Sequence, residues 1–265
     1  MARMSRAVII GSGNVAEAFA RALPGSGVEV VQIFARNAER GRELASLAHC
    51  TTANDPSAIA CADIYIAAVS DRAVAEVLQP LELPEKAVVV HVSGAQPMSV
   101  IPEKFARRGV LYPLQTFTAG RRVDFSEIPM FVEGTDCETT QYIKEFASAL
   151  SKNVRCCDSA QRARIHLAGV FACNFVNAMY SAGNRVAASA DMPFDILKPL
   201  LAETARKAAG SPNPDLVQTG PAVRGDGSSM ERHLRLLADD GNEAAQRLAR
   251  IYREISDYII YGKEL

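Results

Sequence analysis

The chain has 265 residues, of which 48% are hydrophobic, and its formal net charge at pH 7 is -1. A chain of this length buries a substantial core and is expected to divide into two domains. Its near-zero charge gives no general attraction for polyanions, which argues against nucleic acid and acidic membrane surfaces as partners. We therefore expect a globular protein whose partner is a small molecule.

Cysteine usage and the N-terminal sequence indicate the compartment. The six cysteines include no C-x-x-C pair, and the four histidines lie far apart, so neither a zinc site nor a disulfide framework is predicted. The neighbouring Cys156 and Cys157 could be redox-active or inert thiols. The first apolar run, residues 7–10, is too short for an export signal. We expect a cytoplasmic protein without a bound metal.

Short apolar runs alternate with helix-patterned stretches through the first half of the chain. The runs lie at 7–10, 28–34, 63–69 and 87–92, and helical stretches lie at 14–23, 38–48 and 71–79. Further strands are expected at 109–114, 129–134 and about 153–157, with a helix at about 137–150. This alternation predicts an α/β fold with a doubly wound, Rossmann-type parallel sheet covered on both faces.

The strand pattern ends near residue 157. Helical patterns follow at about 158–190, 194–209, 229–239 and 241–260, interrupted by a stretch rich in glycine and proline. We predict a dinucleotide-binding domain at 1–157 and an all-α substrate and dimerisation domain at 158–265.

A glycine-rich turn follows the first predicted strand. Gly11-x-Gly13-x-x-Ala16 stands where the strand ends and the first helix begins. Glycine lets the backbone turn sharply and approach a pyrophosphate, which the amides of the helix N-terminus stabilise. The predicted cofactor-binding residues are Gly11, Ser12, Gly13, Asn14 and Val15, and an ordinary tight turn is the alternative.

The end of the second strand indicates which dinucleotide is bound. An NAD site has a carboxylate about 20 residues after the glycines, whereas an NADP site has a cation. Here the strand ends in Arg36 and Asn37 with no acid at that place. This favours NADP(H); the alternatives are that Arg36 is a solvated surface residue and that Asn37 caps the next helix.

Two other strands end at the same edge of the sheet. Val69, Ser70 and Asp71 follow one strand, and Ser93 and Gly94 follow the next. Because open α/β sheets bind ligands at this edge, we assign the first group to the cofactor and the second to the substrate. Capping of the following helices is the alternative for both groups.

Residues 165–184 carry no formal charge, which could suggest a membrane span. At about 100° per residue, however, the polar side chains fall within an arc of roughly 80°: His166, Asn174, Asn177, Ser181 and Asn184. A helix that is apolar elsewhere and has one polar stripe is predicted to be buried.

The polar stripe has two interpretations. It could line a cleft that faces the nicotinamide, with His166 transferring the proton, Asn174 and Asn184 orienting the substrate and Asn177 binding it. Alternatively, its members satisfy one another in a helical core or in a dimer interface.

A third cluster precedes the predicted helix at 229–239. Ser228 and Glu231 match a capping box. Arg224 could bind an anionic substrate with two hydrogen bonds, or it could pair with Asp226 and stabilise the loop. We expect His233 to be structural.

These motifs together resemble bacterial Rossmann-like proteins with a DUF2520 C-terminal domain. The resemblance rests on Gly11–Val15 and on four further stretches: "HVSG" (91–94), "YPLQTF" (112–117), "HLAGVFACNFVN" (166–177) and "TGPAVRGD" (219–226). It implies an NADP or F420-dependent oxidoreductase, and Arg36 favours the phosphorylated nicotinamide nucleotide over F420.

More distantly, the chain is similar to β-hydroxyacid dehydrogenases, ketopantoate reductases and pyrroline-5-carboxylate reductases. Their helical C-terminal domain closes over the nicotinamide and commonly forms a dimer. His166 looks like the counterpart of the catalytic lysine of ketopantoate reductases, and a histidine with an ordinary pKa near 6.5 is only partly charged at pH 7. The resemblance implies a homodimeric NADP-dependent oxidoreductase for a small carbonyl or imine compound with an anionic group. The alternative is an NADP(H)-binding sensor without turnover.

Overall fold

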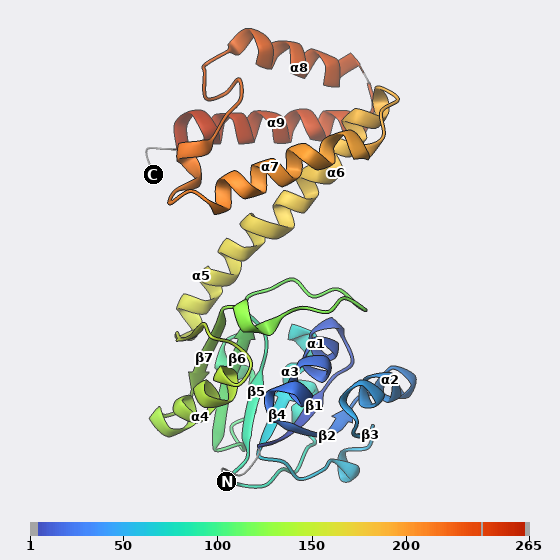
Figure 1. Ribbon diagram of the computed structural model, residues 1–265, viewed down its shortest axis with the longest axis vertical. Coiled ribbons are helices and arrows are strands. Elements are labelled where there is room, and N and C mark those ends of the chain that lie inside the picture. Colours follow the sequence, from blue (N-terminus) through green and yellow to red (C-terminus); the bar gives the residue numbers. More distant parts are fainter. Residues whose placement is uncertain (1–4, 240, 263–265) are drawn as a thin grey trace. The chain divides into compact units, whose positions relative to one another are not determined.

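The computed structural model describes residues 5–239 and 241–262 (Figure 1). The chain divides into two compact units, Met1–Asn174 and Phe175–Leu265. The predicted boundary between a dinucleotide-binding and a substrate domain near residue 157 stays a prediction. By its contacts, the helix that begins at Ser159 belongs to the first unit.

The described part of the first unit contains an eight-stranded sheet in the order β3-β2-β1-β4-β5-β6-β7-β8. The strands are β1 (Arg6–Ile10), β2 (Glu29–Phe34), β3 (Thr51–Ala53), β4 (Ile64–Ala67), β5 (Val88–His91), β6 (Arg107–Pro113), β7 (Met130–Gly134) and β8 (Val154–Cys156). The first six strands are parallel; β7 is antiparallel to β6 and parallel to β8. The predicted α/β class is therefore confirmed, with two reversed strands at one edge and a short edge strand, β3, that the pattern missed.

Helices cover both faces of this sheet. They are α1 (Asn14–Ala22), α2 (Ala38–Ala48), α3 (Val74–Leu78) and α4 (Cys137–Ser148). Alternate residues of β1 enter different cores: Ala7 and Ile9 pack with residues of α1, α2 and α4, whereas Val8 and Ile10 pack with residues of α3. Burial on both faces explains the continuous apolar run of β1. Each fully buried branched side chain contributes roughly 1.5–3 kcal/mol to folding.

The helix that carries His166 is not regular throughout. α5 (Ser159–Gly169) begins with a capping box in which Asp158 and Gln161 bond each other's backbone amides. A π-helical segment, Val170–Phe175, follows it. Because a π-helix has more residues per turn than an α-helix, the projection at 100° per residue fails beyond Gly169.

The prediction that residues 165–184 form a buried helix is also wrong for the single chain. Every residue of this stretch is partly or fully exposed, including Leu167 at 54% and Phe171 at 61%. The apolar side chains of this stretch therefore form a surface that the rest of the chain does not cover.

The second unit consists of α6 (Val176–Ser189), α7 (Lys198–Ala209), α8 (Gly227–Asp239) and α9 (Glu243–Tyr261). The predicted capping box at α8 is wrong: the carboxylate of Asp226 accepts hydrogen bonds from the Ser229 amide and from the hydroxyls of Ser228 and Ser229. His233 of α8 bonds the Tyr252 hydroxyl of α9 at 2.9 Å, which fits a structural role. Within residues 5–239 and 241–262, no helix has the length and apolar character needed to cross a membrane.

Short 3-10 turns complete the elements. They lie at Leu23–Ser26 (η1), Pro56–Ala58 (η2), Asp71–Ala73 (η3), Met98–Val100 (η4), Phe125–Glu127 (η5), Phe194–Leu197 (η7) and Pro214–Val217 (η8).

Candidate functional site

The turn between β1 and α1 leaves space for a phosphate group. Gly11 has a φ of +121°, and a Cβ at this position would lie 2.3 Å from the carbonyl oxygen of Ala68, so only glycine fits beside β4. A Cβ on Gly13 would meet nothing within 4 Å. Gly13 is also the N-cap of α1 and supplies no side-chain cap. The N-terminal amides of α1 are therefore suited to an anion such as pyrophosphate.

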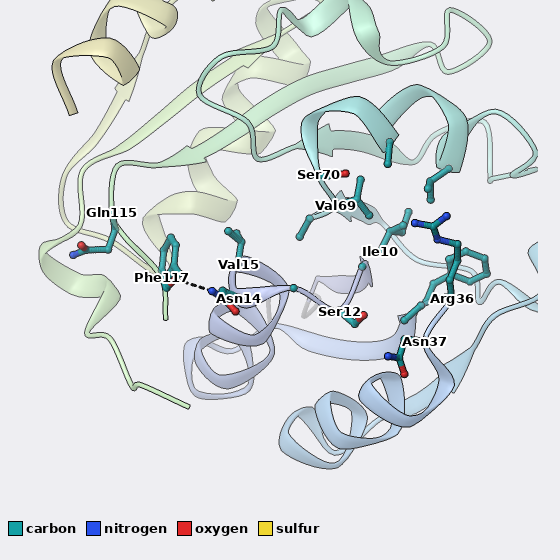
Figure 2. Close-up of a pocket in the computed structure, with 17 residues that line it drawn as sticks. Ile10, Ser12, Asn14, Val15, Arg36, Asn37, Val69, Ser70, Gln115 and Phe117 are labelled. Atoms are coloured by element: carbon teal, nitrogen blue, oxygen red, sulfur yellow. Dashed lines mark hydrogen bonds between the residues drawn. The ribbon is translucent and has the colours of Figure 1, made fainter. Parts of the chain in front are cut away.

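A cavity of about 590 Å³ opens in front of this turn (Figure 2). We call it the first cavity. It lies at the carboxyl ends of β1, β2 and β4, where the order of the parallel strands reverses, and its volume suits a small molecule or cofactor. Nine of the ten residues predicted to bind the cofactor line it: Gly11, Ser12, Gly13, Asn14, Val15, Arg36, Asn37, Val69 and Ser70.

Arg36 supplies the cation of the first cavity. It is exposed two residues after the end of β2, and Figure 2 shows its guanidinium on the cavity side of the strand end. Asn37 has a second role, because its Oδ1 accepts a hydrogen bond from the Arg40 amide and caps α2. The capping interpretation of Asn37 is thus confirmed, and Asn37 also lines the first cavity.

The end of β4 contributes two of its three predicted residues. Val69 and Ser70 line the first cavity, but Asp71, the first residue of η3, is not among its lining residues. Ser70 occupies the N-cap position of η3 without a side-chain hydrogen bond to the turn. The capping alternative therefore does not use the Ser70 hydroxyl.

The loop after β6 closes one side of the first cavity. Gln115 and Phe117 line the cavity from this loop. The Asn14 side chain donates to the Phe117 carbonyl oxygen at 3.0 Å (Figure 2), and the Glu17 carboxylate accepts from the Gly120 amide at 3.0 Å. Two residues of α1 thus hold the loop at two points, a role that the sequence pattern did not reveal.

Glu17 is a nearly buried acid at the centre of this arrangement. Burial disfavours its charged form, but hydrogen bonds from Arg21, the Gly120 amide and Arg40 outweigh that effect and lower the pKa of Glu17. The ion pair to Arg40 joins α1 to α2, whereas the ion pair to Arg21 lies within α1. The carboxylate is therefore charged across the neutral pH range and stabilises the loop, α1 and α2 together.

A second cavity, of about 250 Å³, shares Gln115 with the first. Its wall includes Tyr112 of β6, His166 of α5, and Cys173 and Asn174 of the π-helical segment. The Tyr112 hydroxyl lies 3.1 Å from Nδ1 of His166. The structure therefore brings His166 and Asn174 together, as predicted, and adds Tyr112, which the sequence interpretation missed.

Gly94 closes the back of the Tyr112–His166 pair. It is buried after β5, and a Cβ at this position would lie 2.6 Å from both Nδ1 of His166 and Cζ of Tyr112. Glycine is thus required here by the close approach of the two rings.

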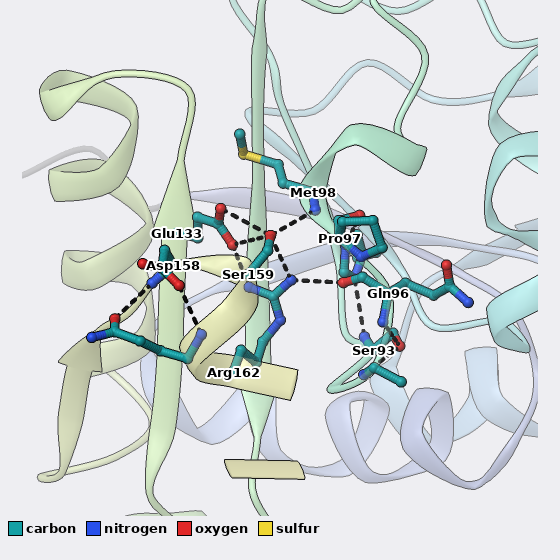
Figure 3. Close-up of polar contacts among 11 residues, drawn as sticks. Ser93, Gln96, Pro97, Met98, Glu133, Asp158, Ser159 and Arg162 are labelled. Carbon is teal, nitrogen blue, oxygen red and sulfur yellow. Dashed lines mark hydrogen bonds and ion pairs between the residues drawn. The ribbon is translucent and has the colours of Figure 1, made fainter. Parts of the chain in front are cut away.

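A buried arginine fixes α5 one turn before His166 (Figure 3). Arg162 is 0% exposed and forms an ion pair with Glu133 of β7. It also donates to the Gln96 carbonyl oxygen at 2.6 Å and to Oγ of Ser159 at 3.1 Å. Removing one partner of a buried ion pair costs about 3–5 kcal/mol. The cluster anchors α5 to the sheet and to the loop after β5, and so sets the position of His166.

Ser93 shapes this loop. It is buried, and its Oγ accepts hydrogen bonds from the amides of Ala95 at 3.1 Å and Gln96 at 3.0 Å. Nδ1 of His91 accepts from the Ser93 amide, and Nε2 lies 3.3 Å from the Pro97 carbonyl oxygen. Substrate binding by Ser93 stays a prediction, since these contacts give its side chain a structural role.

The remaining predicted residues lie in the second unit. Asn177, Asn184 and Arg224 are all exposed there, and their roles toward the substrate stay predictions. Among the described residues, Arg224 forms no ion pair with Asp226. The predicted bracing pair is wrong because the Asp226 carboxylate caps α8 instead.

Comparison with known proteins agrees with this geometry. Residues 6–94 match the family described as NADP oxidoreductase coenzyme F420-dependent, and residues 128–259 match the domain of unknown function DUF2520. A Bacteroides fragilis protein described as a "putative NADP oxidoreductase" is 39% identical, with a TM-score of 0.86 over 97% of this chain and 98% of that one. The chain belongs to the NADP oxidoreductase-like DUF2520 family.

Other solved structures share the fold of this DUF2520 protein. A Thermotoga maritima protein is 22% identical, with a TM-score of 0.76 over 95% of this chain and 99% of that one. A Streptomyces aurantiacus imine reductase is 19% identical, with a TM-score of 0.65 over 96% and 95%. No curated protein matches the sequence. The expected Rossmann-type fold and NADP(H) coenzyme are confirmed at the level of the family.

Tyr112, Gln115 and Arg162 are among the residues of the DUF2520 site that escaped the sequence interpretation. Tyr112 and Gln115 lie within "YPLQTF", which contributed to the resemblance but was given no role. Arg162 stands four residues before His166, on the same side of α5, and this spacing was the available signal. A charged residue one turn from a proposed catalytic group can anchor the helix that presents it.

Proposed function

We propose that this DUF2520 protein transfers hydride between NADP(H) and a small carbonyl or imine compound that bears an anionic group. The observation that carries the proposal is the sharing of Gln115 by two cavities with complementary chemistry. The first offers an uncapped helix N-terminus and Arg36, and the second offers His166. Hydride transfer to a carbonyl or imine needs a proton donor in the same site.

The residues of the first cavity fit NADP(H). Gly11 and Gly13 would leave room for the pyrophosphate at the N-terminus of α1, and Arg36 would bind the ribose phosphate by charge-assisted hydrogen bonds. When bound, the coenzyme supplies or accepts the hydride. Phe117 and Gln115 of the loop after β6 would exclude water from the side of the cavity that they line.

The second cavity would hold the reacting group of the substrate. His166 would give the proton to the carbonyl oxygen or imine nitrogen, and Asn174 would orient that atom by a hydrogen bond. Gly94 would serve this site indirectly, by leaving room for the Tyr112 and His166 rings to meet. Asn184 and Arg224, exposed on the second unit, remain our candidates for binding an anionic group. Relatives of this fold described as imine reductases and as a pyrroline-5-carboxylate reductase support an imine as one substrate class.

A homodimer is part of this proposal. Large apolar side chains lie exposed on the second unit: Met192, Ile196, Leu200, Leu236, Tyr258 and Tyr261. A surface with so many apolar side chains is typical of an interface, and a second copy of the chain is the simplest symmetric partner.

The test is to replace His166 by alanine and to screen keto acids, aldehydes and imines with NADPH. We expect the variant to bind NADPH as the wild type does, because His166 lies in the wall of the second cavity. Turnover should fall by about 10²–10⁴-fold, the usual contribution of a general acid. Both are measured by nicotinamide fluorescence and absorbance. Unchanged turnover would exclude His166 as the proton donor.

The resemblance to ketopantoate reductases, whose catalytic lysine has His166 as its apparent counterpart here, also favours a second function. A sensor of NADP(H) would bind the coenzyme tightly and oxidise none of it with any compound of the panel. That outcome in the wild-type chain would replace the enzymatic proposal.

A further inference from the structure

Tyr112 holds one nitrogen of the His166 ring in a confined place. Its hydroxyl lies 3.1 Å from Nδ1, and the two rings meet edge to face with centroids 6.0 Å apart. Tyr112 is only 8% exposed and stacks on Phe131 of β7 at a centroid distance of 6.4 Å. The tyrosine is thus fixed within the sheet, and it can fix the histidine in turn.

The backbone after β5 confines the same pair from behind. The Cβ that Gly94 lacks would lie 2.6 Å from Nδ1 of His166, so this nitrogen is packed against the chain. Nε2 has no hydrogen-bond partner among the described residues, and His166 lines the second cavity. The two ring nitrogens therefore have different environments, and Nε2 is the one available to a substrate.

A phenol is a suitable partner for a ring that gains and loses a proton. It donates to Nδ1 when the neutral ring carries its hydrogen on Nε2, and it accepts from Nδ1–H in the other tautomer and in the imidazolium. A carboxylate or carbonyl partner could only accept. Burial raises the pKa of Tyr112, although the charge of Arg162 opposes this, so the phenol keeps its own proton at neutral pH.

We infer that Tyr112 is a positioning residue that holds the His166 imidazole by Nδ1 and leaves Nε2 to exchange a proton with the substrate. This inference rests on the proposed function, in which His166 transfers that proton. In the reducing direction, NADPH held in the first cavity would supply a hydride, one hydrogen with two electrons, to the substrate carbon as the C=O or C=N π-bond breaks. The oxygen or nitrogen takes the proton from Nε2 of the imidazolium, whose Nδ1–H stays bonded to Tyr112. Solvent then returns a proton to Nε2.

The test uses Tyr112→Phe, which removes the hydroxyl and keeps the ring. We expect kcat to fall about tenfold, with KM and the NADPH dissociation constant within about twofold of the wild type, because misplacement of a catalytic group lowers the rate and leaves binding intact. The solvent deuterium isotope effect on kcat should rise, since proton transfer becomes more rate-limiting. A merely structural role would leave the isotope effect unchanged.

A matched control is Tyr65→Phe. Tyr65 is a fully buried tyrosine of β4 whose hydroxyl bonds the backbone of Ala60 and Ala62, away from both cavities. The Tyr65→Phe variant should be less stable than the wild type, with an unchanged solvent deuterium isotope effect on kcat. Gly94→Ala provides a second variant that keeps the tyrosine hydroxyl and wedges the pair apart, with Gly25→Ala, whose Cβ meets nothing within 4 Å, as its control.

A readout that does not depend on turnover separates this inference from the proposed function. In protein with ¹⁵N-labelled histidine, the Nδ1 signal of His166 should shift in Tyr112→Phe and stay in place in Tyr65→Phe. If the signal shifts while His166→Ala retains full turnover, the Tyr112 contact stands and the catalytic role of His166 fails. If neither the signal nor kcat changes in Tyr112→Phe, the inference is overturned.

Discussion

Arg36 is the residue on which the proposed coenzyme preference depends. Replacing it by alanine should weaken NADPH binding about 10- to 100-fold and leave NADH within about twofold, because a charge-assisted hydrogen bond contributes about 1.5–3 kcal/mol and 1.4 kcal/mol is tenfold. Fluorescence titration with both coenzymes measures this. Arg72→Ala, an exposed arginine of η3 outside the cavity wall, is the control. Equal losses for NADPH and NADH would remove Arg36 from this role.

The sequence located most directly those residues whose positions follow from local chain geometry. Gly11 and Gly13 were identifiable because a strand, a turn and a helix follow one another within a few residues. Tyr112 was not, because its meaning comes from a contact across 54 positions of the chain. For Ser93 the sequence could not show the loop contacts of its hydroxyl, because a serine that binds a ligand and one that bonds its own loop look the same in the sequence.

At the scale of elements, the loop after β5 carries a pH dependence through His91. Burial first, and then the charge of Arg162, lower the pKa of His91 to about 4 from an ordinary 6.5. Its Nδ1 accepts from the Ser93 amide, which requires the neutral ring. Because the unfolded chain takes up this proton near pH 6.5 and the folded chain only near pH 4, stability is lost as the pH falls through this window.

We expect His91 to account for a loss on the order of 3 kcal/mol in the free energy of unfolding between pH 6.5 and pH 4. Urea unfolding at several pH values measures how the free energy of unfolding depends on pH. In His91→Asn, the free energy of unfolding should change less with pH in this window, whatever the absolute stability of the variant. His49→Asn replaces an exposed histidine with a residue that tolerates its positive φ, and should keep the wild-type slope. An unchanged slope in His91→Asn would contradict the assignment.

Element prediction succeeded where the period was regular and failed where it changed. Strand and helix positions through the sheet followed from alternating patterns, whereas β3, with only three residues, was too short to register. The composition of residues 170–175 does not distinguish a π-helical turn from an α-helical one. The predicted polar stripe assumed 100° per residue throughout, and this period does not hold across the π-helical segment.

At the scale of the whole molecule, the apolar pattern of the helices predicted burial, whereas the single chain leaves many of these side chains exposed. Composition shows that a surface avoids water, yet it does not say whether the same chain or another copy covers it. Leu200 on α7 is 62% exposed, although the sequence pattern around it is that of a core helix.

The proposed homodimer makes Leu200 a direct test. The wild-type chain should have the mass of two chains by light scattering at micromolar concentration, and Leu200→Asp should shift it toward one chain, because a buried unpaired carboxylate costs several kcal/mol. Lys144→Asp, an exposed change on α4 of the first unit, should leave the mass unchanged. A monomeric wild type would end the dimer proposal.

Gln115 belongs to the walls of both cavities, and this restricts how the protein could acquire a different substrate. A larger side chain there would take volume from both cavities at once, so a substitution that reshapes the substrate cavity would also disturb the coenzyme cavity. Divergence toward new substrates can proceed instead through Thr116 and Cys173, which border only the smaller compartment. Related chains with altered substrate range are thus expected to vary at these two positions while position 115 changes little.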